Sequence, residues 1–357
     1  MTRRVIQFST GNVGRESLRM LIERPDLELV GVHASSPGKV GQDAATLAGL
    51  AEPTGVLATD DRDALVALGA DCVVFTAQAE TRPEEALADL CAFLAAGSDV
   101  VSTSFVWLVN PAGADAWLLG PVEDACRAGG SSLYVNGIDP GYSGDTLAYA
   151  ALGLAGTATK VVVQEIFDYA DYDDGDFTGV TFGFGRPADA DPVMMALPGV
   201  VASVWGGSVR LLADALGVEL DEVRDRWENW HTPTRIGCTM MDVPAGGVAA
   251  VRFAAEGVVD GEPVIVVEHV NRLTETAAPD WGYPPVGHTG VHRVRVEGHP
   301  GIEINSHVGL GDVATTHAGV VSTAARVVNA IDAVCAARPG VLTVDDLPVN
   351  LVGRVMS

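Results

Sequence analysis

The first 150 residues alternate short apolar runs with stretches of helical periodicity. The apolar runs have the composition of buried strands, which we expect at Val5–Ser9, Leu27–Val32, Cys72–Thr76, Val100–Thr103 and Leu133–Asn136. The helical stretches between them are Gly14–Glu23, Arg62–Leu68, Pro83–Ala96 and Ala112–Arg127. Strand, helix and strand at this spacing predict a parallel sheet with right-handed crossovers. Residues 1–150 are therefore predicted to form a doubly wound α/β domain.

The pattern changes after residue 150. Longer runs predict mainly antiparallel strands at Val161–Ile166, Val248–Glu256, Pro263–Leu273, His288–Glu297 and Ile302–Ser306. Helices are expected at Val193–Leu216 and Leu220–Trp230. Because strands and helices are segregated here, residues 151–306 are predicted to form an α+β domain with a mostly antiparallel sheet.

The C-terminal segment, residues 307–357, is predicted to centre on one amphipathic helix over Thr316–Ala337. Its apolar residues recur at helical spacing: Val320, Val321, Ala324, Val327, Val328, Ile331 and Val334. The sequence Arg338-Pro339-Gly340 is expected to end this helix.

The first predicted strand runs directly into a glycine turn, and a helix follows. The turn consists of Thr10, Gly11, Asn12, Val13 and Gly14. A dinucleotide pyrophosphate binds to the free N–H groups at such a helix N-terminus, and glycines allow the backbone to approach it. This arrangement indicates a Rossmann domain, although an ordinary strand-to-helix turn remains the alternative. Valine at Gly11 or Gly14 is expected to abolish cofactor binding without unfolding the protein.

The end of the second predicted strand indicates which dinucleotide is bound. Enzymes selective for NAD carry a carboxylate here for the ribose 2′-hydroxyl, whereas this strand ends at His33 and continues without one. Hydroxyl and ammonium groups would favour a 2′-phosphate, so we expect NADP, with His33, Ser35, Ser36 and Lys39 among the cofactor-binding residues. Alternatively these are ordinary loop residues and the enzyme accepts NAD as well.

Two further strand ends face the same edge of the predicted sheet. Thr76 and Ala77 follow one strand, and Ser102 and Thr103 end the next. Ligands of open α/β sheets lie outside the carboxyl ends of the strands, so these small residues are expected to line the nicotinamide half of the site. Small residues are also common at strand ends without any such role.

Composition narrows the possible partners. The 357 residues carry a net charge of -25, which argues against binding to nucleic acid, because phosphate backbones require clustered Lys and Arg. We find no CxxC pair, no metal-ligand spacing, no signal peptide and no long apolar span. The expectation is a cytoplasmic enzyme with a small-molecule substrate, no metal and no membrane or nucleic-acid partner.

Several segments together resemble one known family. They are FSTGNVGRESL at residues 8–18, VGVHASSPGKVGQDAATLAG at 30–49, NGIDPGYSGD at 136–145, FGFG at 182–185 and TAARVVNAIDAVCAARPGVLTVDDLP at 323–348. The chain resembles the dihydrodipicolinate-reductase-like NAD(P)-dependent oxidoreductases, which are related to 2,4-diaminopentanoate dehydrogenase and native amine dehydrogenases. The resemblance implies hydride exchange between the nicotinamide and a carbon that bears nitrogen. It also implies a homodimer, and a final helix that returns to the Rossmann domain.

The chain departs from the family pattern in two places. The reductases carry a double-histidine signature followed by lysine, whereas the nearest match here is His288-Thr289-Gly290-Val291-His292. Amine dehydrogenases carry a glutamate just after the strand that corresponds to Val100–Thr103, where this chain has Phe105, Val106 and Trp107. A buried ammonium without a partner is costly. We therefore expect weak reductive amination with ammonia, improved by glutamate at Phe105 or Val106, unless Asp168 or Asp145 replaces the missing acid.

Three residues are the candidates for proton transfer. Tyr142 follows the predicted strand Leu133–Asn136 at the cofactor edge, and Asp168 and Tyr172 follow the first strand of the second domain. A tight turn at Tyr142 and a solvated acidic loop at the other two are the alternatives. The leading hypothesis is an amine dehydrogenase or imine reductase. A reductase of C=O or C=C bonds that uses no ammonia, and a cofactor-binding protein without catalytic activity, remain open.

Overall fold

The computed structural model describes residues 2–311, 314–349 and 351, which form two compact units. The first unit comprises residues through Ile138 together with those from Val320 onward, and the second comprises Asp139–Gly319. The boundary therefore lies at Ile138 rather than near residue 150, because residues 139–150 pack against the second sheet. In particular, Leu147, Ala148 and Ala151 belong to the core of the second unit.

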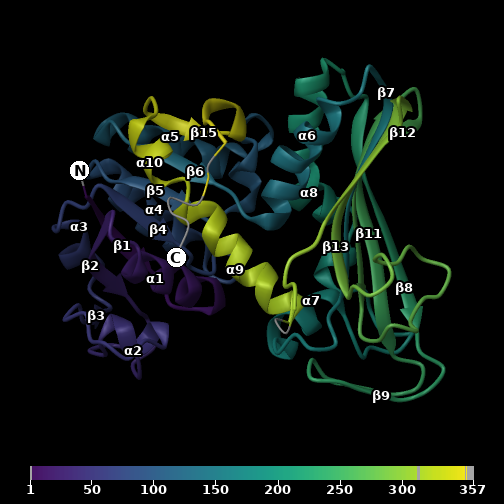
Figure 1. Ribbon diagram of the computed structural model, residues 1–357, viewed down its shortest axis with the longest axis horizontal. Helices are drawn as coiled ribbons and strands as arrows, with labels where there is room; N and C mark the ends of the chain where they lie inside the picture. The colour runs from purple at the N-terminus through teal and green to yellow at the C-terminus, as the bar shows by residue number, and fades with distance from the viewer. Residues whose placement is uncertain (1, 312–313, 350, 352–357) are drawn as a thin grey trace. The chain divides into compact units, whose positions relative to one another are not determined.

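The first unit contains a parallel sheet in the order β15-β6-β5-β4-β1-β2-β3 (Figure 1). Its strands are β1 (Arg3–Phe8), β2 (Leu27–His33), β3 (Ala58–Thr59), β4 (Cys72–Phe75), β5 (Asp99–Ser102), β6 (Ser132–Val135) and β15 (Gly340–Leu342). Its helices are α1 (Asn12–Glu23), α2 (Ala44–Ala48), α3 (Arg62–Val66), α4 (Pro83–Ala95), α5 (Ala116–Gly129) and α10 (Ile331–Ala336). The chain leaves β1 toward β2 and later returns to β4 on the other side of β1. This reversal is the switch point at which a Rossmann sheet binds its ligand.

The second unit contains a mixed sheet in the order β14-β13-β7-β12-β11-β8. Its strands are β7 (Thr157–Asp168), β8 (Glu222–His231), β11 (Val248–Val259), β12 (Glu262–Arg272), β13 (Gly290–His299) and β14 (Ile302–Ser306), with a small ladder of β9 (Ile236–Gly237) and β10 (Asp242–Val243). Only the β7–β12 pair is parallel within this six-stranded sheet. The helices are α6 (Ala148–Leu152), α7 (Val180–Phe182) and α8 (Val200–Leu216). The predicted fold class, a Rossmann sheet plus a mostly antiparallel α+β domain, is confirmed.

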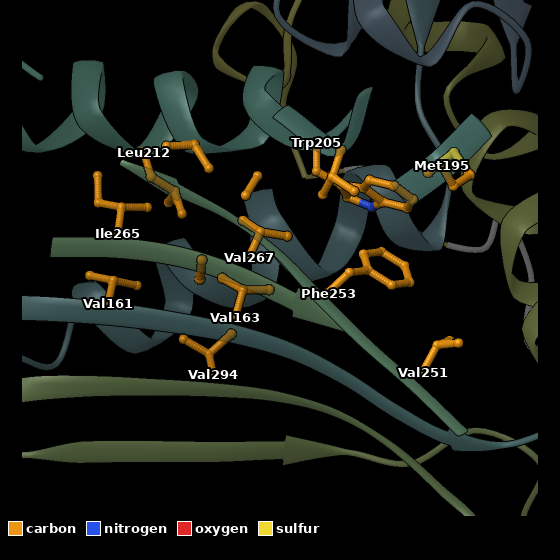
Figure 2. Close-up of a cluster of buried hydrophobic side chains, with 14 of the residues drawn as sticks. Val161, Val163, Met195, Trp205, Leu212, Val251, Phe253, Ile265, Val267 and Val294 are labelled. Carbon is orange, nitrogen blue, oxygen red and sulfur yellow. The ribbon is translucent and has the colours of Figure 1, made fainter. Parts of the chain in front are cut away.

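The core of the second unit lies between α8 and one face of the mixed sheet. Figure 2 shows Trp205 and Leu212 of α8 facing Val267 and Phe253 on the strands below. Alternate residues of each strand point toward this core, and the residues between them point to the opposite face of the sheet. We call these the helix-facing side and the outer side.

Two predicted helices are wrong in detail. Leu220–Trp230 is mostly strand β8, although its apolar residues recur at helical spacing. Arg224 and Arg226 alternate along β8 and form ion pairs with Glu256 on β11, and these contacts stabilise a strand. The predicted helix Thr316–Ala337 is divided into α9 (Thr315–Val328) and α10.

The segment Thr315–Ala336 is long enough, and its mean hydropathy of 1.3 high enough, for a membrane span by composition alone. Its second half nevertheless contributes to the core of the first unit. Val327, Val328, Ile331 and Val334 are each at most 1% exposed there. The apolar composition therefore serves protein packing, as it does in many core helices of soluble proteins.

Candidate functional site: a glycine turn and a buried acid–histidine cluster

The glycine turn connects β1 to α1, and its two glycines have different roles. A side chain on Gly11, the N-cap of α1, would meet no protein atom within 4 Å. A Cβ on Gly14 would instead overlap the carbonyl oxygen of Ser9 and lie 2.7 Å from the hydroxyl of Thr76. The first N–H groups of a helix lack intrahelical partners. Open space at Gly11 therefore fits a phosphate ligand, whereas Gly14 is required by packing.

Lys39 lies directly at this turn. Its ammonium group donates a hydrogen bond of 2.6 Å to the carbonyl of Thr10, and Ser35 and Ser36 are exposed beside it. His33 is different, because its ring is 8% exposed and stacks on Phe8 at 3.9 Å. Burial lowers the pKa of His33 below its ordinary value. Lys39 thus places a positive charge at the helix N-terminus, whereas the buried imidazole of His33 is neutral.

The small residues at the ends of β4 and β5 form hydrogen bonds within the protein. Thr76 donates to the carbonyl of Phe8 at 3.1 Å and accepts from Gln7 at 2.9 Å. The fully buried hydroxyl of Ser102 accepts from the backbone N–H of Ser104 at 2.9 Å. Thr76, Ser102 and the adjacent Ala77 and Thr103 can thus shape a binding surface, although the first two hydroxyls are already engaged.

The segment after β5 presents no carboxylate, as the sequence indicated. Phe105 has a left-handed backbone (φ 58°) and is fully buried in the core of the first unit. Glutamate at this position would bury a charge among apolar side chains, so Phe105→Glu is not a reasonable way to restore activity. Val106 is half-buried and remains a suitable position.

A row of polar side chains crosses the helix-facing side of the second sheet. His292 on β13 pairs with Glu165 on β7, and Glu165 pairs with His269 on β12. These side chains are 1%, 8% and 3% exposed. Asp139, at the start of the second unit, completes what we call the acid–histidine cluster. One ligand atom from each of Asp139, Glu165 and His269 lies within 4.8 Å of the others.

Asp139 and His269 form a buried ion pair. The Nε2 atom of His269 lies 3.3 Å from Oδ1 of Asp139, which also accepts a 2.9 Å hydrogen bond from the indole of Trp205. Burial disfavours both charged forms, but the opposite charge and the hydrogen bond outweigh it. The pKa of Asp139 is consequently lowered and that of His269 raised, so the pair is held in its ionic form.

Glu165 and His292 have their own partners in the cluster. Glu165 accepts hydrogen bonds from the hydroxyl of Tyr169 at 2.9 Å and from the amide of Asn271 at 3.4 Å. Burial, followed by the charge of Glu165, raises the pKa of Tyr169 well above its ordinary value, which keeps this phenol protonated. Nδ1 of His292 is 2.9 Å from the hydroxyl of Ser143, and burial lowers its pKa, so this imidazole is neutral.

Comparisons with known proteins identify the family. A family model described as the 2,4-diaminopentanoate dehydrogenase C-terminal domain matches residues 199–355. An amine dehydrogenase from Streptomyces virginiae is 40% identical over 352 residues, which cover 98% of each chain. This chain belongs to the amine dehydrogenase family. It is an NAD(P)-dependent oxidoreductase, and the resemblance seen in the sequence is confirmed.

Two weaker likenesses agree with this result. The structure of an amine dehydrogenase from Mycobacterium smegmatis has the same fold, with a TM-score of 0.76 and 20% identity over 99% of this chain and 98% of that one. A 4-hydroxy-tetrahydrodipicolinate reductase from Trichormus variabilis is 37% identical over 62 residues, 17% of this chain and 22% of that protein.

In this amine dehydrogenase family member, the three predicted catalytic residues lie in different places and do not form one site. The ring of Tyr172 lies edge-on to Tyr169 at 5.7 Å, next to the acid–histidine cluster. The hydroxyl of Tyr142 lies 3.5 Å from that of Ser306. Asp168 follows Phe167 at the end of β7, and alternation puts its side chain on the outer side, away from Glu165.

The sequence contained a signal for the residues that the candidate list omitted. Glu165, His269, Asn271 and His292 share the helix-facing side of strands β7, β12 and β13 with a set of core valines and one isoleucine: Val161, Val163, Ile265, Val267, Val294 and Val296. Polar residues at core-facing positions are unusual unless they pair with one another or serve a function. The cluster also brings together carboxylate and imidazole groups, which can act as metal ligands, although the sequence spacing predicted no metal site.

Proposed function

We propose that this enzyme interconverts primary amines and imines, and that the acid–histidine cluster holds the reacting nitrogen. The observation that supports this is the balance of charge. Two buried carboxylates, Asp139 and Glu165, face one imidazolium, His269, within 4.8 Å. Buried carboxylates require cationic partners, and one imidazolium balances only one of them. An alkylammonium ion would supply the missing positive charge.

The cluster has the groups that the proton transfers of this reaction require. An amine reaches the enzyme protonated and must lose a proton before its carbon can give up hydride. Glu165 is the proposed base, oriented by the hydroxyl of Tyr169. When bound, the nicotinamide would accept the hydride. Asp139 would then stabilise the positive charge of the iminium product.

The acid–histidine cluster also supplies the carboxylates that the segment after β5 lacks. Asp139 follows Val135, the last residue of β6, by four positions. We propose that Asp139 and Glu165 take over the role of the glutamate missing after β5. Ammonia-dependent turnover is accordingly expected, in place of the weak activity inferred from the sequence alone.

The direct test compares substrates. Purified enzyme should reduce NADP⁺ with primary amines and should consume NADPH when a ketone is supplied with ammonium. The matching alcohols, and the ketones without ammonium, should give little turnover. The opposite result, with alcohols active and amines inert, would contradict the assignment and favour a carbonyl reductase.

NADP is the proposed preferred cofactor, because no carboxylate ends β2 and Lys39 lies at the glycine turn. NADPH should bind about tenfold more tightly than NADH, since one charge-assisted phosphate contact contributes about 1.5–3 kcal/mol. Lys39→Ala should remove most of this preference, measured as dissociation constants by fluorescence titration. Lys160→Ala, in the second unit, is the control. If Lys39→Ala lost affinity equally for NADH and NADPH, Lys39 would be assigned to the pyrophosphate, and the proposed preference for NADP would be contradicted.

The two glycines of the turn should respond differently to the same substitution. Gly11→Val is expected to weaken NADPH binding at least about tenfold with an unchanged melting temperature, because the added methyl groups would meet only the ligand. Gly14→Val should lower the melting temperature, because its Cβ overlaps Ser9. This corrects the expectation that both variants remain fully folded. Unchanged NADPH affinity in Gly11→Val would place the nucleotide elsewhere.

A cytoplasmic homodimer is the remaining part of the proposal. The outer side of the second sheet carries both signs of charge, with Arg226 bridging Glu228, Glu256 and Glu268. Mixed charge on one face suits a two-fold interface, in which each patch meets a copy of itself. The five cysteines are all free thiols, which fits a reducing compartment. Light scattering during size-exclusion chromatography tests the dimer.

A further inference from the structure

Two neighbouring cavities lie in the second unit at the carboxyl end of β7. Their volumes are about 440 Å³ and about 540 Å³, and both are lined by Asp168, Glu275 and Thr289. The larger cavity is also lined by Arg272, Tyr283 and Pro284. None of these residues takes part in the proposed reaction, so the cavities need a separate explanation.

Arg272 is the unusual residue here, because it is a buried cation bound only to neutral groups. The side chain is 2% exposed, and its guanidinium donates to the carbonyls of Ala277 at 2.9 Å and Gly282 at 2.8 Å. It also lies 4.1 Å above the ring of Tyr283. Within the part of the chain that the structure describes, its Nη1 atom has no hydrogen-bond partner. A buried charge of this kind favours an anion as its partner.

Two carboxylates, Asp168 and Glu275, line the same cavity as Arg272. Asp168 and Arg272 occupy paired positions of the parallel strands β7 and β12. Burial and the nearby charges of Asp171 and Glu275 raise the pKa of Asp168, whereas the positive charge of Arg272 acts in the opposite direction. Arg272, Asp168 and Glu275 thus present charges of both signs around one cavity. This arrangement matches a molecule that carries a carboxylate and an ammonium group on neighbouring atoms.

We infer that the larger cavity binds a free amino acid, with its carboxylate toward Arg272 and its ammonium toward Asp168 and Glu275. Tyr283 and Pro284 provide apolar surface for a side chain such as that of leucine. The site is distinct from the acid–histidine cluster, because Asp168 and Arg272 point to the outer side of the sheet while Glu165 and His269 point to the helix-facing side. The ligand would act as an effector rather than as the substrate.

The test measures the binding of L-leucine to the full-length enzyme by calorimetry and thermal shift. L-Leucine should bind saturably and raise the melting temperature, whereas 4-methylpentanoate and 3-methylbutylamine, which each lack one charged group, should bind at least about tenfold more weakly. Asp168→Asn should weaken L-leucine binding by about tenfold to a hundredfold and leave the kcat for amine oxidation unchanged. Glu165→Gln should retain L-leucine binding.

Three results would overturn the inference. The first is the absence of saturable L-leucine binding at millimolar concentrations. The second is binding that Glu165→Gln abolishes, because that would place L-leucine in the acid–histidine cluster as a substrate. The third is a large loss of kcat in Asp168→Asn, which would return Asp168 to the catalytic site. Arg272→Lys is a second variant for the anion contact. Because this substitution also changes the hydrogen bonds to the 277–283 loop, circular dichroism would verify that the variant remains folded.

Discussion

Glu165→Gln is expected to lower kcat for amine oxidation by about 10²- to 10⁴-fold, the usual contribution of a general base. The amide has the shape of the carboxylate and can still accept the hydrogen bond from Tyr169, but it can neither take up a proton nor balance an alkylammonium charge. Amine-dependent reduction of NADP⁺ at saturating amine measures the effect. Dissociation constants for NADPH should not change, because the nucleotide is expected on the first unit.

Glu268→Gln is the matched control for this variant. Glu268 lies on the neighbouring strand β12, is also 8% exposed, and loses the same charge on substitution. Its carboxylate points to the outer side of the sheet, where it binds Arg226 and Gln164. We expect the kcat of Glu268→Gln to remain within about threefold of the parent value, and its stability to fall instead. Full activity in Glu165→Gln, or equal losses in both variants, would contradict the assignment of Glu165 as base.

The Rossmann half of this fold was predictable because its elements are local in sequence. Each strand of a parallel sheet is one short apolar run, and the helix that crosses to the next strand follows it directly. The prediction of a strand at Cys72–Thr76 therefore differs from β4 by one residue. By contrast, the apolar residues Leu220, Val223 and Trp227 fit both a helix and a strand. Only the partner strand β11, which supplies Glu256 to Arg224, decides between the two.

The acid–histidine cluster could not be predicted for a related reason. Glu165, His269 and His292 are far apart in the sequence, and each appears there as one polar residue within an apolar strand. Their row across the sheet depends on the register of β13 with β7 and of β7 with β12. The second pair is parallel, which the pattern of an antiparallel domain does not suggest. Asp168 was selected instead, because a single sequence does not show which side of the sheet each residue faces.

His269→Ala is expected to lower the free energy of unfolding by about 3–5 kcal/mol, because it leaves the buried carboxylate of Asp139 without its cation. Stacking of the imidazole on Phe253 at 4.7 Å and contact with Trp205 at 4.6 Å would be lost as well. Chemical denaturation near neutral pH measures the change. His292→Ala is the matched control. That side chain is equally buried but neutral, so we expect a loss of only about 1–3 kcal/mol, from one hydrogen bond and a cavity.

The pH dependence of this difference distinguishes charge from packing. The pKa of His269 is raised in the folded protein, so its ionic contribution is complete below the ordinary value of 6.5 and is lost as the pH rises through the raised value. The pKa of Asp139 is lowered, so its contribution is present above 3.8 and is lost as the pH falls through the lowered value. The gap in stability between the parent and His269→Ala should therefore be widest between these limits and should narrow on either side.

The gap in stability between the parent and His292→Ala should vary less with pH. A gap for His269→Ala that stays constant from acidic to alkaline pH would show that packing alone holds His269 in place, and Asp139 would then be neutral in the folded protein.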